Sequence, residues 1–309
     1  MSRDASADIL ARHGRSFAWA ARFLPREQAR NATRLYAFCR TVDDLADREG
    51  GPTAAARLDR LSRSLGTERP REPLARAFAV LDRDVGLTVS AARQLIDGVS
   101  SDLSPVRVGD QSDLLRYAYR VGGTVGILMC DVLGVHDPKA RRHAVDLGIA
   151  MQLTNIARDV GEDAMAGRRY LPARWVLAEP AEILRPTPEL EASIRRCVLR
   201  LVALSEHYYA SGAAGLRYLP VQPRLAITVA AQLYRAIGTR LSQRGGDYLS
   251  GRTVVPHWRK IALTLGAAVL PPATRRLAHD RSLHTDFEDL IRPAIMPGPN
   301  RGGLDHVAA

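Results

Sequence analysis

The stretch from Gly148 to Pro172 carries two neighbouring stripes of side chains at helical spacing, and it constrains the fold more than any other part of the chain. Four polar residues follow one another at intervals of three, four and four, which places them on one face of a helix. A solvated face normally borders water, whereas this one borders residues that belong in a core. The polar stripe is Gln152, Asn155, Asp159 and Asp163, and the apolar stripe is Ile149, Leu153, Ile156 and Val160.

The polar stripe has the composition of a metal- and anion-binding face. Carboxylates four residues apart on a helix stand about 6 Å apart along its axis. Hard cations such as Mg²⁺ take oxygen ligands and keep several waters, so this spacing suits them. The amides of Asn155 and Gln152 add neutral ligands or hydrogen-bond donors.

A second stretch, from Leu35 to Asp47, repeats this pattern. One such stripe alone is more often an ordinary solvated face. Two of them, each beside a core stripe and each carrying an arginine (Arg40 and Arg158), favour a pair of acidic helices that face each other across a central cavity. The polar residues are Tyr36, Arg40, Asp43 and Asp47, and the apolar ones are Leu35, Phe38, Val42 and Leu45.

The 309 residues are 46% hydrophobic and 25% charged, which is an ordinary globular composition with enough apolar residues for a large core. The net charge is +11, and Lys139 and Lys260 are the only lysines. Arginine-biased codon usage would explain this, and so would a surface that meets phosphates. Charge alone does not decide between the two. Three cysteines without paired spacing indicate free thiols in a reducing cytosol, each in an apolar segment. They are Cys39, Cys130 and Cys197.

The rest of the chain predicts helices and no strands. Breakers stand at Pro25, at 50–52 and at Gly167, and the second acidic helix is expected to run from 137 to 164. Glycines at 122, 123 and 126 interrupt a helical pattern, which indicates either close helix packing or the approach of a bulky group to the backbone. Dinucleotide-binding, phosphate-loop and nucleophile-elbow motifs are absent from the sequence. We therefore expect an all-α, single-domain helical bundle around a central cavity.

Two facing acidic stripes beside apolar walls suit one kind of chemistry. Bound Mg²⁺ would bridge to diphosphates while a long apolar group occupies the cavity between the helices. Metal and arginine stabilise the departing diphosphate, so that a carbon–oxygen bond can ionise. The resulting allylic cation needs a dry pocket that keeps water away. The pattern therefore favours an isoprenoid enzyme.

The chain resembles the squalene/phytoene synthase family, most closely its bacterial phytoene synthases, over roughly residues 9–265. The segment MQLTNIARDVGEDAMAGRRYLP carries the most specific part of the resemblance. The other matching segments are HGRSFAWAARFLP, LYAFCRTVDDLAD, GGTVG and AAQLYRAI. The resemblance implies an isoprenoid-synthase-type bundle in residues 1–270. Residues 271–309 have no counterpart in the family, and their composition, rich in Pro, Gly, Arg and His, predicts a basic, partly disordered tail.

The activity implied by this resemblance is a prenyltransferase reaction of carotenoid biosynthesis. Two geranylgeranyl diphosphates would condense head to head through prephytoene diphosphate to 15-cis-phytoene, with Mg²⁺ or Mn²⁺ and without NADPH. The implied metal ligands are Asp43, Asp47, Asn155 and Asp159, assisted by Asp163. Contacts to the diphosphates or the isoprenoid are implied for His13, Ser16, Tyr36, Arg40, Gln152, Arg158 and Tyr234. His13, Ser16 and Tyr234 rest on the resemblance alone.

Three alternatives stand beside this hypothesis. A squalene or dehydrosqualene synthase would use two farnesyl diphosphates, and the pocket floor that sets chain length is not visible in the sequence. A non-catalytic relative would have lost residues of the metal face, and none is lost here. A nucleic-acid binder would cluster its basic residues with aromatics, whereas here the arginines are scattered and 6% of residues are aromatic.

The sequence also suggests where the protein resides. No secretory signal is apparent, and the longest apolar runs, such as 261–270, are shorter than the roughly 20 residues of a spanning helix. We expect a cytoplasmic protein that contacts the inner face of the membrane peripherally. The basic segment from Pro271 to Arg301 is a candidate for this contact, with a solvated tail as the alternative.

Overall fold

The structure is a computed structural model that describes residues 6, 8–10, 15–269 and 278–295. These residues form helices, turns and loops, and the only β-type pairing among them is an isolated bridge between Arg107 and Arg169. The all-α prediction is therefore confirmed. In the N-terminal half the helices are α2 (Arg15–Ala21), α3 (Arg26–Asp44), η1 (Leu45–Glu49), α4 (Gly51–Ser64), α5 (Pro73–Val85), α6 (Val89–Ser100), η2 (Ser101–Leu103), α7 (Gln111–Ala118), η3 (Tyr119–Gly123) and α8 (Thr124–Val132).

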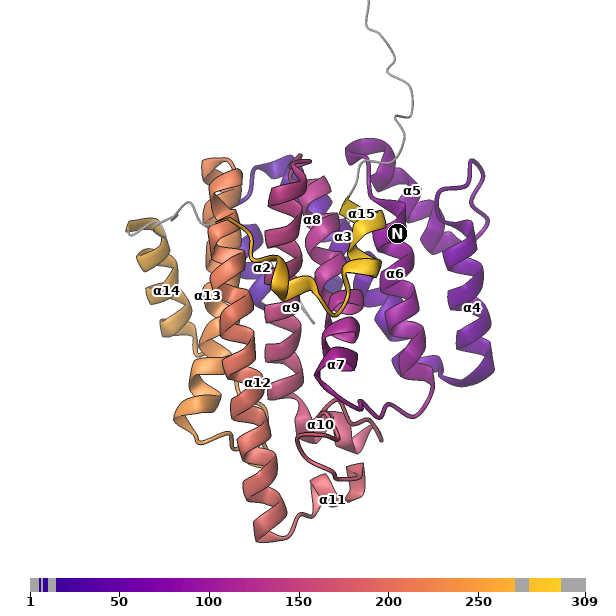
Figure 1. The fold of residues 1–309 in the computed structure, drawn as a ribbon. Helices are drawn as coiled ribbons and strands as arrows, with labels where there is room; N and C mark the ends of the chain where they lie inside the picture. The colour runs from indigo at the N-terminus through magenta and orange to yellow at the C-terminus, as the bar shows by residue number, and fades with distance from the viewer. Residues whose placement is uncertain (1–5, 7, 11–14, 270–277, 296–309) are drawn as a thin grey trace, which may run out of the picture.

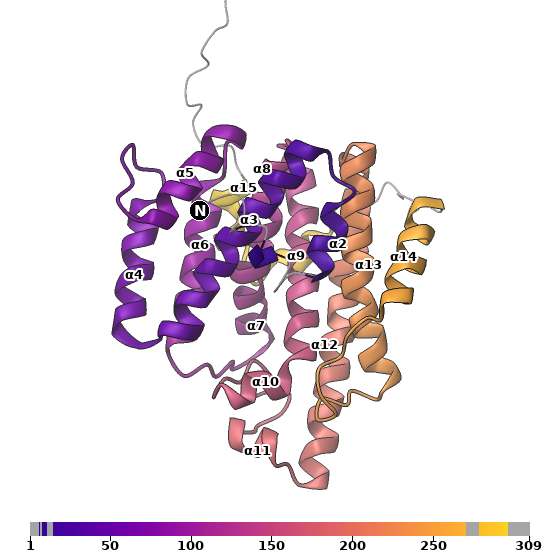
Figure 2. The same cartoon turned by 180° about the vertical axis from the view of Figure 1, so that it is seen from behind.

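The C-terminal half is arranged around one long helix, α9. The helices here are α9 (Pro138–Arg158), α10 (Val160–Met165), α11 (Pro180–Leu184), α12 (Pro188–Gly215), η4 (Leu216–Tyr218), α13 (Val221–Gln243), α14 (His257–Val269), η5 (Arg281–His284) and α15 (Glu288–Ile295). Helix α9 begins at a capping aspartate, Asp137, whose side chain accepts from the Lys139 amide, with Pro138 in the first turn. Figures 1 and 2 show α9 in the middle of the bundle, where α8, α12 and α13 pack against it.

The glycines at 122 and 126 are explained by close packing of two helices. A Cβ on Gly122 would overlap the carbonyl oxygen of Gly148 on α9, and one on Gly126 would overlap the carbonyl oxygen of Ala144. The backbones therefore touch where a side chain would hold them apart. Because Gly122, Gly126 and Gly148 also line the central cavity, the same contact shapes its wall.

Both acidic helices depart from a regular α-helix where the acidic residues stand. Helix α3 changes at Leu45 into a π-helical turn, η1, which carries Asp47. Such turns are rare and occur frequently at functional sites. The expected continuous helix over 137–164 is wrong in one respect, because α9 ends at Arg158. Asp159 has φ −102° and ψ 15°, and α10 begins at the next residue. Asp159 and Asp163 nevertheless line the same cavity.

The segment 278–295 does not behave as part of a tail. The side chains of Phe287 and Ile291 are fully buried in the main hydrophobic core, together with Ala294 and Ile295. Tyr119 stacks on Phe287 with ring centroids 5.1 Å apart. The expected boundary at residue 270 therefore does not separate this segment from the bundle, because its apolar residues at helical spacing complete the core. The remainder of the expected tail, 271–277 and 296–309, lies outside the described residues.

A buried carboxylate attaches this segment to α9. Asp146 is fully buried and accepts hydrogen bonds from Nε2 of His279 at 2.8 Å and from Nε2 of His284 at 2.7 Å. The hydroxyl of Ser211 on α12 donates a third hydrogen bond, at 2.5 Å. Although burial raises the pKa of Asp146, these bonds outweigh it and lower the pKa below its ordinary value.

The same three residues have the spacing of metal ligands, since their ligand atoms lie within 4.8 Å of one another. Hydrogen bonding accounts for this geometry. Arg142 can only donate, and its Nη1 lies 3.1 Å from Nδ1 of His284. The proton of His284 is therefore on Nε2, where it points at Asp146 and leaves no lone pair for a metal. We assign the group a structural role.

Candidate active site

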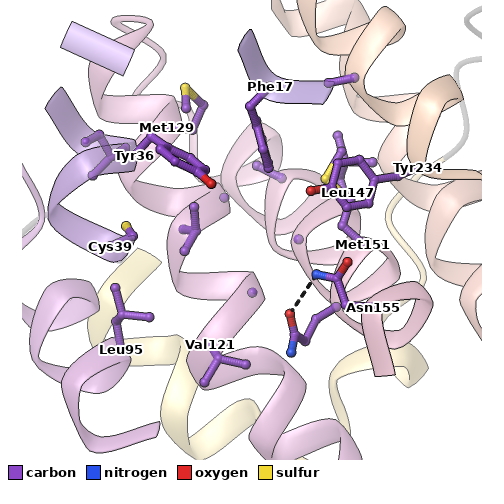
Figure 3. A pocket seen from close by; sticks show the side chains of 18 of the residues that line it. Phe17, Tyr36, Cys39, Leu95, Val121, Met129, Leu147, Met151, Asn155 and Tyr234 are labelled. Atoms are coloured by element: carbon purple, nitrogen blue, oxygen red, sulfur yellow. Dashed lines mark hydrogen bonds between the residues drawn. The ribbon is translucent and has the colours of Figure 1, made fainter. Parts of the chain in front are cut away.

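One cavity of about 490 Å³ runs along α9 between the two acidic helices. Its walls come from α2, α3, α6, α8 and α13 as well as from α9 (Figure 3). Along α9 the lining residues recur every three or four positions from one end of the helix to the other, so a single face borders the cavity throughout. They are Ala140, His143, Ala144, Leu147, Gly148, Met151, Gln152, Asn155, Ile156, Arg158 and, just past the helix end, Asp159.

Five aspartates gather at the end of the cavity where α9 terminates. Asp43 and Asp47 come from α3 and η1, Asp159 and Asp163 from the junction of α9 and α10, and Asp102 from η2. We refer to these five residues as the acidic mouth.

Burial and the crowding of carboxylates keep two carboxyl groups of the acidic mouth out of their ordinary titration range. Burial, with the charge of Asp47 adding to it and that of Arg40 opposing, raises the pKa of Asp43 to about 7. Burial and the charge of Asp159 raise the pKa of Asp163 to about 8. Carboxylates crowded in this way repel one another, and a divalent cation relieves that repulsion.

Arginines alternate with the acidic groups. Arg168 donates to Asp47 at 2.8 Å, and Arg40 lies 3.6 Å from the same carboxylate. On the other side, Arg158 donates from Nε to Asp159 at 2.6 Å, and Arg252 lies 3.2 Å from Asp159. All four side chains line the cavity. Guanidinium groups bind phosphate oxygens with two N–H groups at once, so this ring can receive an anion that bridges both acidic helices.

The amide of Asn155 fits a metal ligand. Its nitrogen donates to Oε1 of Gln152 at 3.3 Å (Figure 3), which directs its oxygen away from Gln152. That oxygen is buried and has no hydrogen-bond partner among the described residues. A buried carbonyl oxygen without a partner is costly unless something binds it. Together with the neighbouring carboxylates, it forms a donor set of oxygens suited to Mg²⁺.

Three aromatic rings surround the cavity next to the acidic mouth. The ring of Phe17 lies 5.6 Å from that of Tyr36 and 5.5 Å from that of Tyr234, measured between centroids. Figure 3 shows all three around one part of the cavity. Burial raises the pKa of Tyr36 far above its ordinary value, so its hydroxyl stays protonated. Aromatic faces attract positive charge, so these rings can stabilise a cation next to the acidic mouth.

Away from the acidic mouth the cavity is apolar and long. Helix rise is 1.5 Å per residue, so the lined face of α9 from Ala140 to Asp159 spans about 28 Å. A second hydrophobic cluster surrounds the distant end, where Cys130, Leu133 and Ala140 all line the cavity. A cavity with a charged entrance and an apolar depth fits a molecule with a charged head and a hydrocarbon chain.

The structure brings most of the predicted residues together. The cavity is lined by Tyr36, Arg40, Asp43, Asp47, Gln152, Asn155, Arg158, Asp159, Asp163 and Tyr234. Ser16 lies on α2 but is not among the lining residues, and His13 lies outside the described residues. The free cysteines are confirmed, with Cys130 and Cys197 buried and Cys39 on the cavity wall.

The site also contains four polar residues that were not predicted from the sequence: Asp102, Arg168, Arg252 and Tyr170. Asp102 accepts hydrogen bonds from the hydroxyls of Tyr117, at 3.0 Å, and Tyr170, at 2.8 Å. Burial raises the pKa of Asp102 despite these bonds. Asp102 and Arg252 belong to no helical stripe, whereas Arg168 and Tyr170 lie within the segment from Met151 to Pro172 that carries the most specific resemblance, directly after the turn at Gly167.

Comparison with known proteins identifies the family of this all-helical fold and its acidic cavity. A family model described as squalene/phytoene synthase matches residues 10–259. The chain is 36% identical to a phytoene synthase of Rhodobacter capsulatus, over 93% of this chain and 86% of that protein. It is 35% identical to a 15-cis-phytoene synthase of Enterobacter agglomerans, over 86% and 94%. The chain therefore belongs to the squalene/phytoene synthase family.

Solved structures agree with this assignment. A dehydrosqualene synthase crystallised with a ligand superposes with a TM-score of 0.76 at 25% identity, covering 86% of this chain and 95% of that one. A squalene synthase from Alicyclobacillus acidocaldarius has the same fold, with a TM-score of 0.68 at 22% identity, over 79% of this chain and 94% of that one. The expected isoprenoid-synthase-type fold is thus confirmed.

Proposed function

We propose that this protein is a prenyltransferase that joins two geranylgeranyl diphosphates head to head through prephytoene diphosphate and forms 15-cis-phytoene. One observation carries the proposal: a single cavity combines an acidic, arginine-flanked mouth with an apolar depth along the whole of α9. The phytoene synthases with which the chain shares about a third of its residues support the same reaction.

In this proposal the acidic mouth holds the charged heads of the substrates. Asp43, Asp47, Asn155 and Asp159 would ligate Mg²⁺, or Mn²⁺ in its place, with Asp163 assisting. When bound, the metal neutralises the diphosphate and favours its departure. Arg40, Arg158, Arg168 and Arg252 bind the remaining diphosphate oxygens and keep the leaving group near the carbon that it leaves.

The cavity wall controls the cations that follow. The C–O bond of the first substrate breaks, and its allylic cation alkylates the double bond of the second. Loss of a proton closes the cyclopropane of prephytoene diphosphate. Departure of the second diphosphate, rearrangement and loss of another proton yield the hydrocarbon. Phe17, Tyr36 and Tyr234 offer their ring faces to the cations, and the apolar walls exclude the water that would trap them. Since a proton is lost at the end, NADPH is not required.

The length of the cavity supports C20 over C15 substrates. From Asn155 back to Ala140, towards the start of α9, the face that lines the cavity extends for about 22 Å. The small side chains of Ala140 and Ala144 keep the end of the cavity that is distant from the acidic mouth open. The alternative, a squalene or dehydrosqualene synthase, would use the same acidic mouth with shorter chains. We therefore propose that the depth of the cavity determines which chain length the enzyme uses.

The direct test is product identification. Purified protein with geranylgeranyl diphosphate and Mg²⁺, and without reductant, should yield a C40 hydrocarbon with phytoene's three conjugated double bonds. Asp47→Asn should abolish product formation. Asp59→Asn, which changes an exposed aspartate on α4 paired with Arg63, should leave it intact. A hydrocarbon formed only when NADPH is supplied would contradict the proposal.

A further inference from the structure

The outward face of α14 is apolar although it is exposed. Trp258 is 69% exposed, Leu265 61% and Val269 75%, with Ile261 between them on the same side of the helix. The inward side is apolar as well, since Ala267 and Leu263 pack in a hydrophobic cluster with α2 and α13. A helix that is apolar on both sides is normally buried. Figures 1 and 2 both show α14 at the outer edge of the bundle beside α13.

This face is one helix removed from the cavity. Trp19 on α2 donates from its indole nitrogen to the hydroxyl of Thr264 on α14, at 2.9 Å. On the opposite side of α2, Phe17, Ala20 and Ala21 line the cavity. Helix α2 is thus a thin wall between the cavity and α14.

The segment of the chain that contains α14 carries charges of a single sign. Between Tyr248 and His279 the sequence contains no Asp or Glu and five Arg or Lys. Arg252 is engaged with Asp159 at the acidic mouth, and Arg259 and Lys260 lie on the first turn of α14 beside the exposed Trp258. An apolar stripe bearing a tryptophan, flanked by basic residues, is the pattern of helices that lie in a membrane interface. Among the described residues, no helix combines the length and the apolar character needed to cross a bilayer.

We propose that the outward face of α14 docks on an anionic lipid bilayer. This face is formed by Trp258, Ile261, Leu265 and Val269. Helix α2 then separates the cavity from the bilayer, and the product passes between the two at this helix. A second copy of the chain is the competing occupant. A two-fold contact would bring this acid-free segment against itself, and like charges facing each other disfavour association. An anionic leaflet attracts the same charges.

This inference rests on the proposed function only for the identity of the molecule that moves from the cavity to the bilayer. That molecule is an uncharged C40 hydrocarbon, which is poorly soluble in water. The contact with the membrane is thereby moved to α14 from the segment 271–301, in which Phe287, Ile291 and Ile295 are buried in the core.

The test is co-sedimentation of the full chain with phosphatidylcholine vesicles, with and without phosphatidylglycerol, in the absence of substrate. Wild type should bind the anionic vesicles at low salt and dissociate as salt increases. Trp258→Glu combined with Leu265→Glu should reduce the bound fraction about tenfold or more. Two apolar side chains that would be buried in the bilayer are lost, and two negative charges that an anionic leaflet repels are added. Leu177→Glu is the matched control, since Leu177 is 78% exposed just before α11, away from α14.

Each remaining outcome has a defined meaning. Binding of the double variant at the wild-type level, or no binding by wild type at low salt, would overturn the proposal. So would a wild-type dimer that the double variant converts to monomers without any vesicle binding. If the double variant melts at a lower temperature than wild type, Trp258→Ala alone replaces it. Because vesicle binding is measured without turnover, failure of this surface and failure of the proposed reaction are distinguishable.

Discussion

Arg168, in the loop after α10, donates a hydrogen bond of 2.8 Å to Asp47 on η1 and thereby joins the two acidic segments across the entrance of the cavity. The two residues are 121 positions apart in the chain. Both the donor and the acceptor belong to the groups that the proposed function assigns to diphosphate and metal. When these ligands bind, Arg168 exchanges Asp47 for the diphosphate, and Asp47 exchanges Arg168 for the metal. The ion pair thus holds both side chains at the entrance before the ligands arrive.

Arg168→Gln should lower kcat/KM by about a hundredfold or more, because it removes one charge-assisted contact to the departing diphosphate. The free energy of unfolding should change by less than about 1 kcal/mol, since the pair is partly exposed. Arg63→Gln, which breaks an exposed pair with Asp59, is the control and should keep wild-type kinetics. Steady-state assays with denaturation curves measure both quantities. Equal kinetics for the two variants would remove Arg168 from the site.

Mg²⁺ should raise the melting temperature of wild type, because a ligand that binds only the folded protein stabilises it, by about 2.7 kcal/mol at a hundredfold excess over Kd. Asp47→Asn and Asp159→Asn should lose this shift. Without metal, Asp43→Asn should melt no lower than wild type, since it removes a buried carboxyl group whose ionisation its acidic neighbours oppose. Asp59→Asn should retain the full shift. A Mg²⁺ shift that survives in both site variants would place the metal elsewhere. Excess EDTA should abolish turnover.

Asp146→Asn should destabilise the fold by about 2–4 kcal/mol, because a buried carboxylate that accepts three hydrogen bonds becomes an amide with a misplaced donor. The pKa of Asp146 is lowered in the folded state, so its contribution is fully present above the unfolded pKa of about 3.9 and is lost as pH falls through the folded pKa. The difference between wild type and variant should therefore shrink below about pH 4.

Urea denaturation at several pH values measures this difference. Asp289→Asn is the matched control, because Asp289 pairs with Arg116 on the exposed side of the neighbouring α15 and should cost less than about 1 kcal/mol. A pH-independent loss in Asp146→Asn would mean that the ionised carboxylate is not what attaches the C-terminal segment.

Gly126→Ala should destabilise the protein by about 1–3 kcal/mol, since the added methyl group meets the Ala144 carbonyl and forces α8 away from α9. Gly266→Ala on α14 is the matched substitution in open space and should stabilise by about 0.5–1 kcal/mol through helix propensity. Chemical denaturation compares the two. Similar effects of both substitutions would argue against a backbone contact between α8 and α9.

The acidic helices were predictable because their residues repeat along the chain. A face that recurs every three or four residues survives the π-helical turn at Asp47 and the break at Asp159, since neither changes the side of the cavity on which the next carboxylate stands. Asp102 and Arg252 follow no such period. They reach the site because the bundle folds η2 and the loop before α14 towards it, which is a tertiary effect without local signal.

The packing of the C-terminal segment was likewise not predictable from the sequence, because it depends on tertiary contacts. Composition rich in Pro, Arg and His favoured a tail after residue 270, yet His279 and His284 find their partner in Asp146, which lies in the middle of α9. A single aspartate inside a long helix reads as an ordinary polar position. Only the packed structure shows that three hydrogen bonds converge on it and that Phe287 completes the core beside it.

The most direct test of the central claim is a competition between chain lengths. Equal concentrations of farnesyl and geranylgeranyl diphosphate, with Mg²⁺ and no reductant, are offered to the purified protein, and the C30, C35 and C40 hydrocarbons are separated and quantified. A cavity open along the whole of α9 predicts that the C40 product predominates by about tenfold or more, since each buried CH₂ contributes about 0.8 kcal/mol. Predominance of the C30 product would contradict the assignment and favour the farnesyl-using alternative.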